Sequence, residues 1–448
     1  LLNSWNLVLP AAQIRPGLSV LADVDPGNEI PESDEDDNTY PNDGTPLALT
    51  VQAVAPYRTR FVPVLQTGNG LTGDVNAANV ETYLTMLRAI YPLAEVDADV
   101  RAAYTFTGLL GNAFTEDWIR LLDEINALRH VEDSGRYYYG VIKTTHTSGA
   151  AGLGYLGQSP LQPTSAIGVD WLNVRDWVMA HEVGHNFGRR HSPCGNPGLV
   201  DASFPYVDGR IGLHGWDMRT NMLLSAGEHF DIMSYCLPGW ASDYTYESVR
   251  EFRGAAGATL SAGASVGASA QPSLLVWGRI SPEGLVLEPA FEVVARPVLP
   301  TARGAHQLDI LDAAGNPLLE LSFDGQAVDH VPDVEHFSFL VPLSSLRGAS
   351  PGTIRLRAGG REVVQRPALP AAAGPGQELR STRRGSSRVR LEWDAARHPV
   401  VLVRDARTGA VLSFARGGDV ELVSDAAELD VHLSDGVRSA RRRLQVGR

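Results

Sequence analysis

The chain has 448 residues and a formal net charge of −14, with 45 Gly, 28 Pro and 44% hydrophobic residues. This length predicts two to four domains, and the negative charge argues against a nucleic-acid partner, because phosphates would repel it. No apolar run approaches the ~18 residues that a membrane-spanning helix needs. The first residue is Leu1 and no signal-peptide pattern follows it, so we interpret the chain as mature or trimmed.

The first segment, residues 1–45, alternates short apolar runs with turn residues. It is too short for a core of its own, and we interpret it as a strand-rich lead-in or the tail of a β module. Its acidic stretch from Glu29 to Asp37 lacks the spacing and the glycine of an EF-hand, so we expect a solvated loop there. A bound Ca²⁺ is an alternative that the pattern does not support.

The second segment, residues 46–257, alternates strand and helix patterns. Short apolar runs predict strands at 61–65, 100–108, 137–143 and 165–170. Apolar residues at helical spacing predict helices at 76–91, 115–130, 174–187 and 241–257. Ser242 is the expected N-cap of the last helix. This order predicts an α/β (or α+β) domain in which helices flank a mixed, twisted sheet.

The remaining residues show no helical period. Two low-complexity stretches, 258–271 and 370–377, are expected to be linkers. Residues 272–369 and 378–448 contain short alternating strands separated by Gly, Pro and Asn. Each stretch has the size of one β sandwich, so we predict two all-β domains of the immunoglobulin or fibronectin-III type.

The stretch HEVGHNFGRRH contains histidines at a spacing that suits a metal ion. His181 and His185 lie four residues apart, so on a helix both project from one face and can take adjacent corners of a tetrahedral zinc. Gly188 can end the helix in the left-handed conformation, which lets His191 approach the same ion. Three imidazoles leave the fourth position for water, as in catalytic zinc sites. Glu182 lies beside the ligands, where a carboxylate can accept a proton from that water.

Two other interpretations of these residues remain. The helix could carry a polar face with fortuitous histidines, although the motif fixes five positions. A structural zinc would take Cys194 as its fourth ligand, but Glu182 would then have no function. His330 and His336, far downstream, lack any pattern that predicts a partner, and we expect no metal role for them.

The same stretch matches the signature of the metzincin zinc metalloendopeptidases at every defining position, so this part of the chain resembles that family. The family also requires a methionine turn, for which HFDIMSYC supplies Met233. The resemblance implies that Met233 forms an apolar floor beneath the metal without binding it. It also implies that Tyr235 binds the resting metal or hydrogen-bonds the oxyanion, as in astacin-like and serralysin-like members. An ordinary core tyrosine is the alternative.

In metzincins an edge strand above the cleft pairs with extended substrate. The resemblance assigns this role to Gly152, Leu153, Gly154 and Tyr155, because small residues there would let a peptide backbone approach closely. The helix expected at 115–130 is extra to the minimal fold, so we expect an elaborated upper subdomain.

The two cysteines follow two metal-site residues at equal spacing. Cys194 comes three residues after His191, and Cys236 comes three residues after Met233. If the metzincin arrangement brings His191 and Met233 together below the zinc, the cysteines emerge close to one another. We therefore predict a disulfide between them; a free thiol pair or a regulatory metal ligand is the alternative.

These features predict a secreted or cell-surface zinc endopeptidase with one catalytic Zn²⁺. It would hydrolyse peptide bonds of extracellular proteins or glycoproteins by zinc-activated water, with Glu182 as the general base. The β-sandwich appendages look most like those of secreted bacterial metzincins that act on extracellular proteins and mucin-type glycoproteins. We expect a monomer. Two other classes stay open: a catalytically weak adhesin or glycan-binding protein on the same scaffold, and a zinc amidase or deacetylase.

Overall fold

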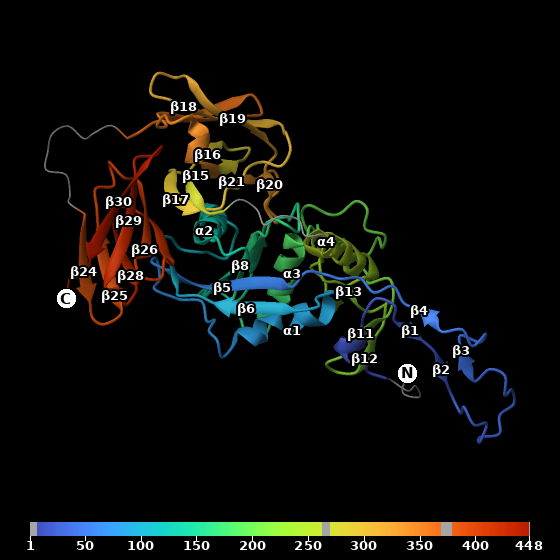
Figure 1. Cartoon of the computed structure of the whole chain (residues 1–448). Helices are drawn as coiled ribbons and strands as arrows, with labels where there is room; N and C mark the ends of the chain where they lie inside the picture. Colours follow the sequence, from blue (N-terminus) through green and yellow to red (C-terminus); the bar gives the residue numbers. More distant parts are fainter. Residues whose placement is uncertain (1–6, 262–268, 369–378, 448) are drawn as a thin grey trace.

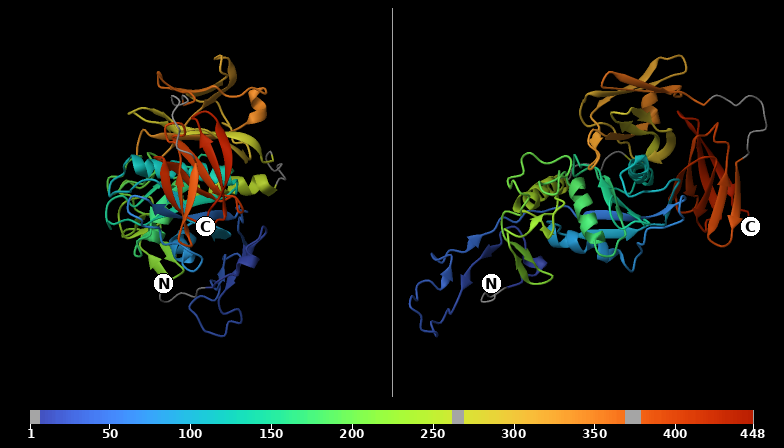
Figure 2. Two further views of the ribbon diagram at one scale, coloured as in Figure 1. Left: turned by 90° about the vertical axis from the view of Figure 1, so that its left-hand side faces the viewer. Right: turned by 180° about the vertical axis from the view of Figure 1, so that it is seen from behind.

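The computed structural model describes residues 7–261, 269–368 and 379–447. A central body of sheet and helices carries a projecting N-terminal arm and two β domains (Figure 1). The arm and the second β domain lie at opposite ends of the molecule (Figure 2). No helix in the described part of the chain is both long and apolar enough to cross a membrane.

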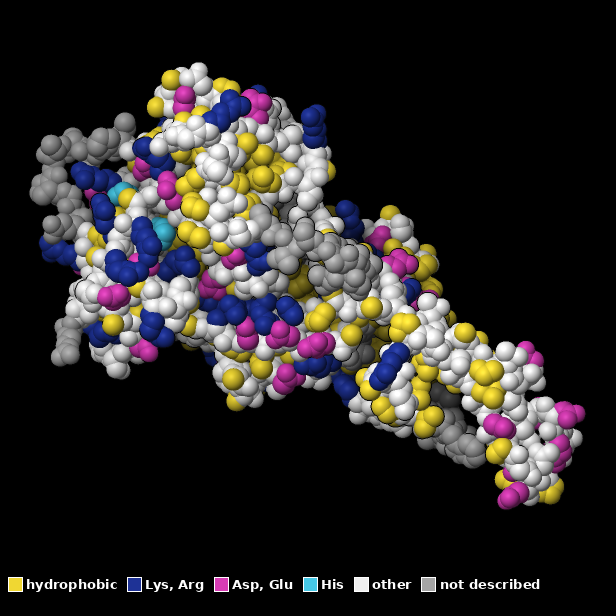
Figure 3. All heavy atoms as spheres, viewed as in Figure 1, with side chains coloured by type: hydrophobic (Ala, Val, Ile, Leu, Met, Phe, Trp, Pro, Cys, Tyr) yellow, Lys and Arg dark blue, Asp and Glu magenta, His cyan; other side chains and the backbone are white. Residues whose placement is uncertain are grey.

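The arm consists of two short strand pairs and a 3₁₀ turn at Ala11–Gln13. β1 (Ser19–Val20) pairs with β4 (Leu47–Ala48), and β2 (Ala22–Asp23) pairs with β3 (Thr39–Tyr40). No side chain between residues 7 and 56 is buried, so the arm has no core of its own. Acidic side chains gather toward its far end (Figure 3), which agrees with the solvated acidic loop expected there.

Six strands form the central sheet: β5 (Tyr57–Gln66), β6 (Val96–Val100), β7 (Tyr104–Phe106), β8 (Tyr137–Ile142), β9 (Gly152–Gly154) and β10 (Ser165–Val169). Their order is β6-β5-β8-β10-β9, with β7 beside β5. All pairings are parallel except that of β9 with β10, so β9 is an antiparallel edge strand. The sheet is mixed, as predicted. The single strand expected at 100–108 is wrong, because β6 ends at Val100 and β7 begins at Tyr104.

The described residues contain four α-helices: α1 (Val80–Ile90), α2 (Glu116–Glu132), α3 (Arg175–Asn186) and α4 (Asp243–Ser261). α1 and α3 pack on one face of the sheet and α2 packs on the other. The side chains of β5 contact both layers, because successive residues of a strand point to opposite faces. Phe61 belongs to the core with α1 and α3, whereas Val62 and Val64 belong to the core with α2.

The strands between α3 and α4 lie outside the central sheet. Two short pairs lie there: β11 (Gly215–Asp217) with β12 (Met222–Leu224), and β13 (Phe230–Asp231) with β14 (Gly239–Trp240). Ser242 caps α4 as expected, since the amide of Thr245 donates to its Oγ at 3.0 Å. α4 continues to Ser261, beyond the expected end at 257 and into the expected linker, of which residues 262–268 lie outside the described residues.

The first β domain is built of two sheets. Its strands are β15 (Gln271–Ile280), β16 (Leu285–Leu287), β17 (Phe291–Ala295), β18 (His306–Leu311), β19 (Pro317–Phe323), β20 (Gln326–Ala327), β21 (Glu335–Pro342), β22 (Thr353–Ala358) and β23 (Arg361–Gln365), with a 3₁₀ turn at Leu343–Leu346. One sheet has the order β16-β15-β21-β20 with β17 beside β15, and the other has the order β19-β18-β22-β23. Residues of both sheets, such as Leu274 and Ile310, share one hydrophobic core.

The second β domain also has two sheets. Its strands are β24 (Arg380–Arg384), β25 (Arg388–Glu392), β26 (Val400–Asp405), β27 (Val411–Arg416), β28 (Asp419–Val423), β29 (Glu428–Ser434) and β30 (Ser439–Gln445). They form the sheets β24-β25-β28 and β27-β26-β29-β30 around a core that includes Trp393. The all-β character agrees with the prediction, whereas the immunoglobulin or fibronectin-III type stays a prediction. The linker expected at 370–377 lies outside the described residues.

The extra helix α2 lies between the central sheet and both β domains. Leu275 and Trp277 of the first β domain, and Leu402 and Phe414 of the second, belong to the same hydrophobic core as α2. The three parts of the chain are therefore packed together rather than strung on free linkers. This contact gives α2 a structural role, since it joins the central sheet to both β domains.

A buried polar cluster on α2 strengthens this contact. Asp123 is fully buried, and its Oδ2 accepts a hydrogen bond from Nη1 of Arg279 at 2.8 Å. Its Oδ1 accepts from the hydroxyl of Tyr155 at 2.6 Å and lies 2.9 Å from Nδ1 of His336. Burial alone would raise the pKa of Asp123, but His336 and Arg279 outweigh burial and hold that pKa below its usual value. The carboxylate of Asp123 on α2 therefore connects this helix to Tyr155, the residue after β9, and to Arg279 of the first β domain.

Candidate metal centre

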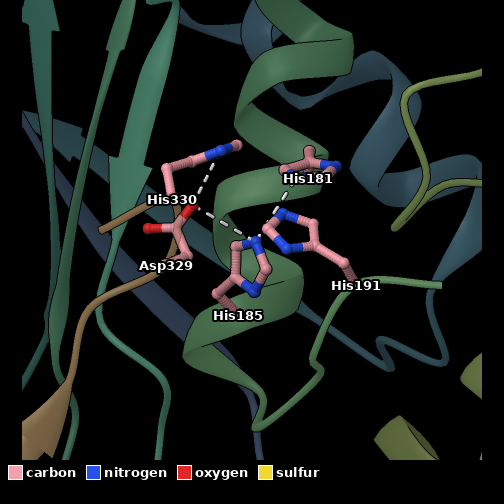
Figure 4. A group of neighbouring side chains, drawn as sticks. All are labelled: His181, His185, His191, Asp329 and His330. Carbon is pink, nitrogen blue, oxygen red and sulfur yellow. Dashed lines mark hydrogen bonds and ion pairs between the residues drawn. The ribbon is translucent and has the colours of Figure 1, made fainter. Parts of the chain in front are cut away.

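Three histidines of the central body point toward one another (Figure 4). His181 and His185 project from successive turns of α3, and their Nε2 atoms are 3.3 Å apart. The chain leaves α3 at Gly188, which has a φ of +80° and whose amide donates to the carbonyl of His185 at 2.8 Å. This left-handed turn returns the chain so that the ring centroid of His191 lies 4.7 Å from that of His185.

Each of the three imidazoles is oriented by a hydrogen bond from its Nδ1 atom to a backbone carbonyl. The acceptors for His181, His185 and His191 are the carbonyls of Ile232, Arg189 and Gly198, at 2.8, 2.6 and 2.6 Å. A carbonyl oxygen can only accept, so the proton resides on Nδ1 and each Nε2 keeps its lone pair. Such carbonyl partners are typical of metal-binding histidines, because they fix both the tautomer and the ring orientation.

The donor set fits a metal of the zinc type. Two ligands at 2.0–2.1 Å from a tetrahedral zinc lie about 3.3 Å apart, which matches the separation of the Nε2 atoms of His181 and His185. Burial, followed by the neighbouring imidazoles, lowers the pKa of His181, and it lowers that of His191 to about 3. The rings are therefore neutral near pH 7, as metal binding requires.

Glu182 lies next to the histidines without joining them. Its carboxyl group is buried, and Oε2 has no hydrogen-bond partner. Burial, and next the charge of Asp329, raises the pKa of Glu182 well above its usual value. The edge strand approaches it closely, since a Cβ added to Gly152 would lie 2.7 Å from Cδ of Glu182. A glycine at this position leaves space for the carboxyl group.

The predicted methionine turn lies directly beneath α3. Met233 is 1% exposed, and its Sδ is 3.7 Å from the hydroxyl of Tyr91, which donates to the carbonyl of Ala180. Oδ1 of the buried Asp231 accepts from the amide of Met233 at 2.8 Å, and Oδ2 accepts from the amide of Ser242. Asp231 thus connects the turn to the start of α4. Our sequence interpretation missed Asp231 and Tyr91; the position of Asp231 two residues before Met233 was the available signal.

Tyr235 lies at the opening of the site rather than in the core. Its side chain is 43% exposed, which excludes the core alternative. Its hydroxyl is 3.4 Å from Nε2 of His191 and contacts Nδ1 of His330. Burial, and next the charges of Asp329 and Glu182, raises the pKa of Tyr235, so the hydroxyl keeps its proton.

Two residues of the first β domain complete the cluster. Asp329 and His330 follow β20, and their side chains point at the histidines of α3 (Figure 4). Oδ2 of Asp329 is 3.3 Å from Nε2 of His185 and 2.8 Å from Nε2 of His330. Nε2 of His330 is 3.7 Å from Oε1 of Glu182. The sequence shows no pattern that predicts a partner for His330, and it is docking of the β domain that brings this residue to the site.

Asp329 and His330 affect each other's charge. Burial alone would lower the pKa of His330, but the carboxylates of Asp329 and Glu182 outweigh it and raise that pKa to about 10. Burial would likewise raise the pKa of Asp329, yet the charge of His330 outweighs it and holds that pKa below its usual value. Aspartate and imidazolium therefore form a buried ion pair beside the three metal-site histidines.

The family comparison agrees with this geometry. Residues 78–192 match the family described as Metallo-peptidase family M12B Reprolysin-like. The chain carries a metzincin-type zinc metallopeptidase domain. The matched range contains α1, α2, α3 and the three histidines of the metallopeptidase motif, and it ends before the methionine turn.

Two solved structures are similar to the chain at low sequence identity. No curated protein matches the chain in sequence. The crystal structure of metalloproteinase-II from Bacteroides fragilis is 15% identical with a TM-score of 0.26, covering 45% of this chain and 55% of that one, so the chain spans about half of its length. The central fibronectin-III array of RIM-binding protein is 10% identical with a TM-score of 0.12, covering 41% of this chain and 71% of that one. At these TM-scores neither alignment defines the fold.

The disulfide predicted for the metallopeptidase domain is present. Cys194 and Cys236 are bonded, with a Cα–Cα distance of 5.8 Å. The loops that carry them are also paired, since the amide of Tyr235 donates to the carbonyl of Cys194 at 3.2 Å and that of Ser192 donates to the carbonyl of Met233 at 3.1 Å. The bond therefore joins the loop that follows His191 to the methionine turn.

The predicted substrate strand of the metallopeptidase domain corresponds to β9 and the one residue after it, Tyr155. Gly152 and Gly154 both lie against Glu182, whereas the side chain of Tyr155 points the other way and bonds Asp123. The outer edge of this strand is not free. It is paired with the residues around β20 of the first β domain, which the sequence interpretation did not anticipate.

Proposed function

We propose that the chain is a zinc-dependent endopeptidase that cleaves proteins or glycoproteins outside the cell. The observation that carries the proposal is a single constellation. Three buried Nε2 atoms with carbonyl-bonded Nδ1 partners converge beside a buried carboxyl group, Glu182, that has an unpaired oxygen. Burial of a carboxylate oxygen without a hydrogen-bond partner costs free energy of folding, and groups of this kind cluster at functional sites.

The residues take separate roles in peptide hydrolysis. His181, His185 and His191 would hold one Zn²⁺, which when bound supplies a Lewis acid that polarises the scissile carbonyl and lowers the pKa of water. Glu182 accepts a proton from the attacking water at Oε2 and delivers it to the leaving nitrogen. The protonated hydroxyl of Tyr235 donates to the substrate oxygen as that oxygen becomes negative.

Other residues position this machinery. Met233 is buried beneath α3, where its sulfur lies beside Tyr91, and Gly188 turns the chain so that His191 reaches the cluster. Once the residues around β20 leave it, the antiparallel edge of the metallopeptidase sheet would provide backbone groups for an extended polypeptide. This edge favours a protein substrate over the small amides that an amidase or a deacetylase would take.

The disulfide and the β domains support action outside the cell. Disulfides persist in oxidising compartments, and the metallopeptidase domain is packed against two β domains that could position it on a large substrate or glycoprotein. A surface adhesin that merely retains the scaffold is the competing function. An adhesin would not need a buried carboxylate such as Glu182 beside intact metal ligands, so this arrangement favours the endopeptidase.

The proposal is tested by metal removal. The protein is incubated with fluorescent casein or a mucin-type glycoprotein, with 1,10-phenanthroline or with its non-chelating 1,7 isomer. We expect the 1,10 isomer to reduce cleavage to background, and Zn²⁺ to restore it, because three neutral nitrogens bind zinc far better than Ca²⁺ or Mg²⁺. Elemental analysis is expected to give one zinc per chain. Cleavage that survives chelation would refute the zinc endopeptidase, and a zinc-loaded protein that cleaves nothing would favour the adhesin.

A further inference from the structure

We propose that the loop between β20 and β21 closes the active site, with Asp329 as a fourth protein ligand of the metal and residues 326–330 in the place of substrate. The inference rests on the proposed zinc endopeptidase function and adds a latent state to it. Three separate contacts support the proposal: one at the metal position, one at the edge strand and one at the general base.

The carboxylate of Asp329 lies where a fourth ligand belongs. Its Oδ2 is 3.3 Å from Nε2 of His185, the same separation as between the Nε2 atoms of His181 and His185. The ligand atoms of Asp329 and the histidines all lie within 4.8 Å of one another. Oδ2 is buried, and its polar neighbours are Nε2 of His185 at 3.3 Å and Nε2 of His330 at 2.8 Å, so a metal would take the place of the His330 contact. Carboxylate oxygens are ordinary zinc ligands, so a metal held here would have three nitrogens and one oxygen from the chain itself.

The residues before Asp329 pair with the edge strand as an extended substrate would. The amide of Leu156 donates to the carbonyl of Ala327 at 2.9 Å, and the amide of Asp329 donates to the carbonyl of Gly154 at 3.1 Å. Oδ1 of Asp329 also accepts from the amide of Gly154. The chain thus adds a strand to its own catalytic sheet, and the backbone groups that would bind a peptide are already used.

His330 occupies the space beside the general base. Its Nε2 is 3.7 Å from Oε1 of Glu182. Its ring is stacked between those of Phe114 and Tyr235, at centroid distances of 4.9 and 5.4 Å and interplanar angles of 19° and 15°. A substrate group approaching Glu182 or the hydroxyl of Tyr235 would have to displace this imidazole.

The loop, rather than the whole β domain, is the part that can withdraw. The domain is fixed against α2 by the buried Trp277 and by the pair of Asp123 with Arg279. β20, in contrast, contributes two residues at the edge of its sheet, and the turn at 332–333 that follows is exposed. Withdrawal of the loop also requires the buried side chains of Val328 and Val334 to leave the core around α2. Movement of this loop alone would free the metal position, the strand edge and Glu182 together.

The test compares wild-type protein with Asp329→Ala, and with Asp329→Asn in case the alanine variant fails to fold. Asn keeps an acceptor for the amide of Gly154 but removes the charge. Asp324→Ala is the matched control, because Asp324 is an exposed carboxylate just before β20. The bound zinc is replaced by Co²⁺, whose visible spectrum reports the ligand set. The affinity for acetohydroxamate and the kcat/KM for casein are then measured.

We expect the cobalt spectrum to change in the two Asp329 variants and to remain unchanged in Asp324→Ala. We also expect acetohydroxamate to bind at least ~10-fold more tightly, and kcat/KM for casein to rise at least ~10-fold, because apparent affinity falls with the fraction of open sites. Equal spectra, affinities and rates in wild type and variants would overturn the loop closure and leave the endopeptidase intact. A loss of cleavage with metal retained would also overturn it, because Asp329 would then assist catalysis. A changed spectrum with tighter hydroxamate binding but no cleavage in any variant would support the closure and refute the endopeptidase.

Discussion

Replacing Glu182 with glutamine is expected to lower kcat for peptide hydrolysis by about 10²–10⁴-fold, the usual contribution of a general base. Glutamine has nearly the same size, but its amide cannot accept the proton of the attacking water. The metal should stay bound, because Glu182 does not contribute a ligand atom to the cluster formed by His181, His185, His191, Asp329 and His330. The change therefore separates proton transfer from metal binding.

The rate should be measured in an Asp329→Ala background, so that closure of the β20–β21 loop does not limit turnover. Zinc content per chain is determined for the same preparations. Glu228→Gln provides the control, since Glu228 is an exposed carboxylate between α3 and α4 of the same domain. If Glu182→Gln turns over casein at the rate of its parent, another group must move the proton and the assigned role of Glu182 is wrong.

Removing the disulfide with the pair Cys194→Ala and Cys236→Ala is expected to reduce the free energy of unfolding by roughly 4 kcal/mol, the chain-entropy value for a loop of about 43 residues. We also expect the double variant to bind zinc less tightly. The bond joins the loop after His191 to the turn that contains Met233, and the carbonyl of Ile232 in that turn orients His181. Without the disulfide, the segments that position His181 and His191 are no longer covalently joined.

Two measurements check this prediction. Urea denaturation at fixed zinc concentration gives the change in unfolding free energy, and competition with a chromogenic chelator gives the change in zinc affinity. A reductant added to the wild-type protein should reproduce both effects. A double variant that unfolds within about 1 kcal/mol of wild type, with unchanged zinc affinity, would show that the paired backbones alone hold the two loops together.

Much of the metal site is determined by local sequence. The spacing of His181 and His185 places both rings on one face of a helix whatever surrounds it, because the period of the helix is fixed. Gly188 adopts the left-handed turn that returns His191 to them. The order of strands and helices likewise predicts the mixed sheet, since apolar periodicity records which faces are buried.

The sequence also predicted the disulfide, although by resemblance rather than by periodicity. The equal spacing of Cys194 and Cys236 from His191 and Met233 had meaning only within the metzincin arrangement. The same route led to Tyr235, but it did not predict that the hydroxyl would contact His330. A sequence motif predicts the positions of its own residues only. It gives no information about residues such as His330 that reach the site from another domain.

What the tertiary structure alone decided is the closure of the site. Asp329 and His330 lie in a segment whose alternating pattern predicts no more than a strand edge of a β domain. They reach His185 and Glu182 because α2, an extra helix, docks that domain onto the central sheet through Trp277 and the Asp123 cluster. Docking depends on complementary surfaces formed by residues distant in sequence, and no local period records such surfaces. The sequence by itself therefore determined the cluster of three histidines beside Glu182, whereas the tertiary structure determined that the chain's own loop lies across it.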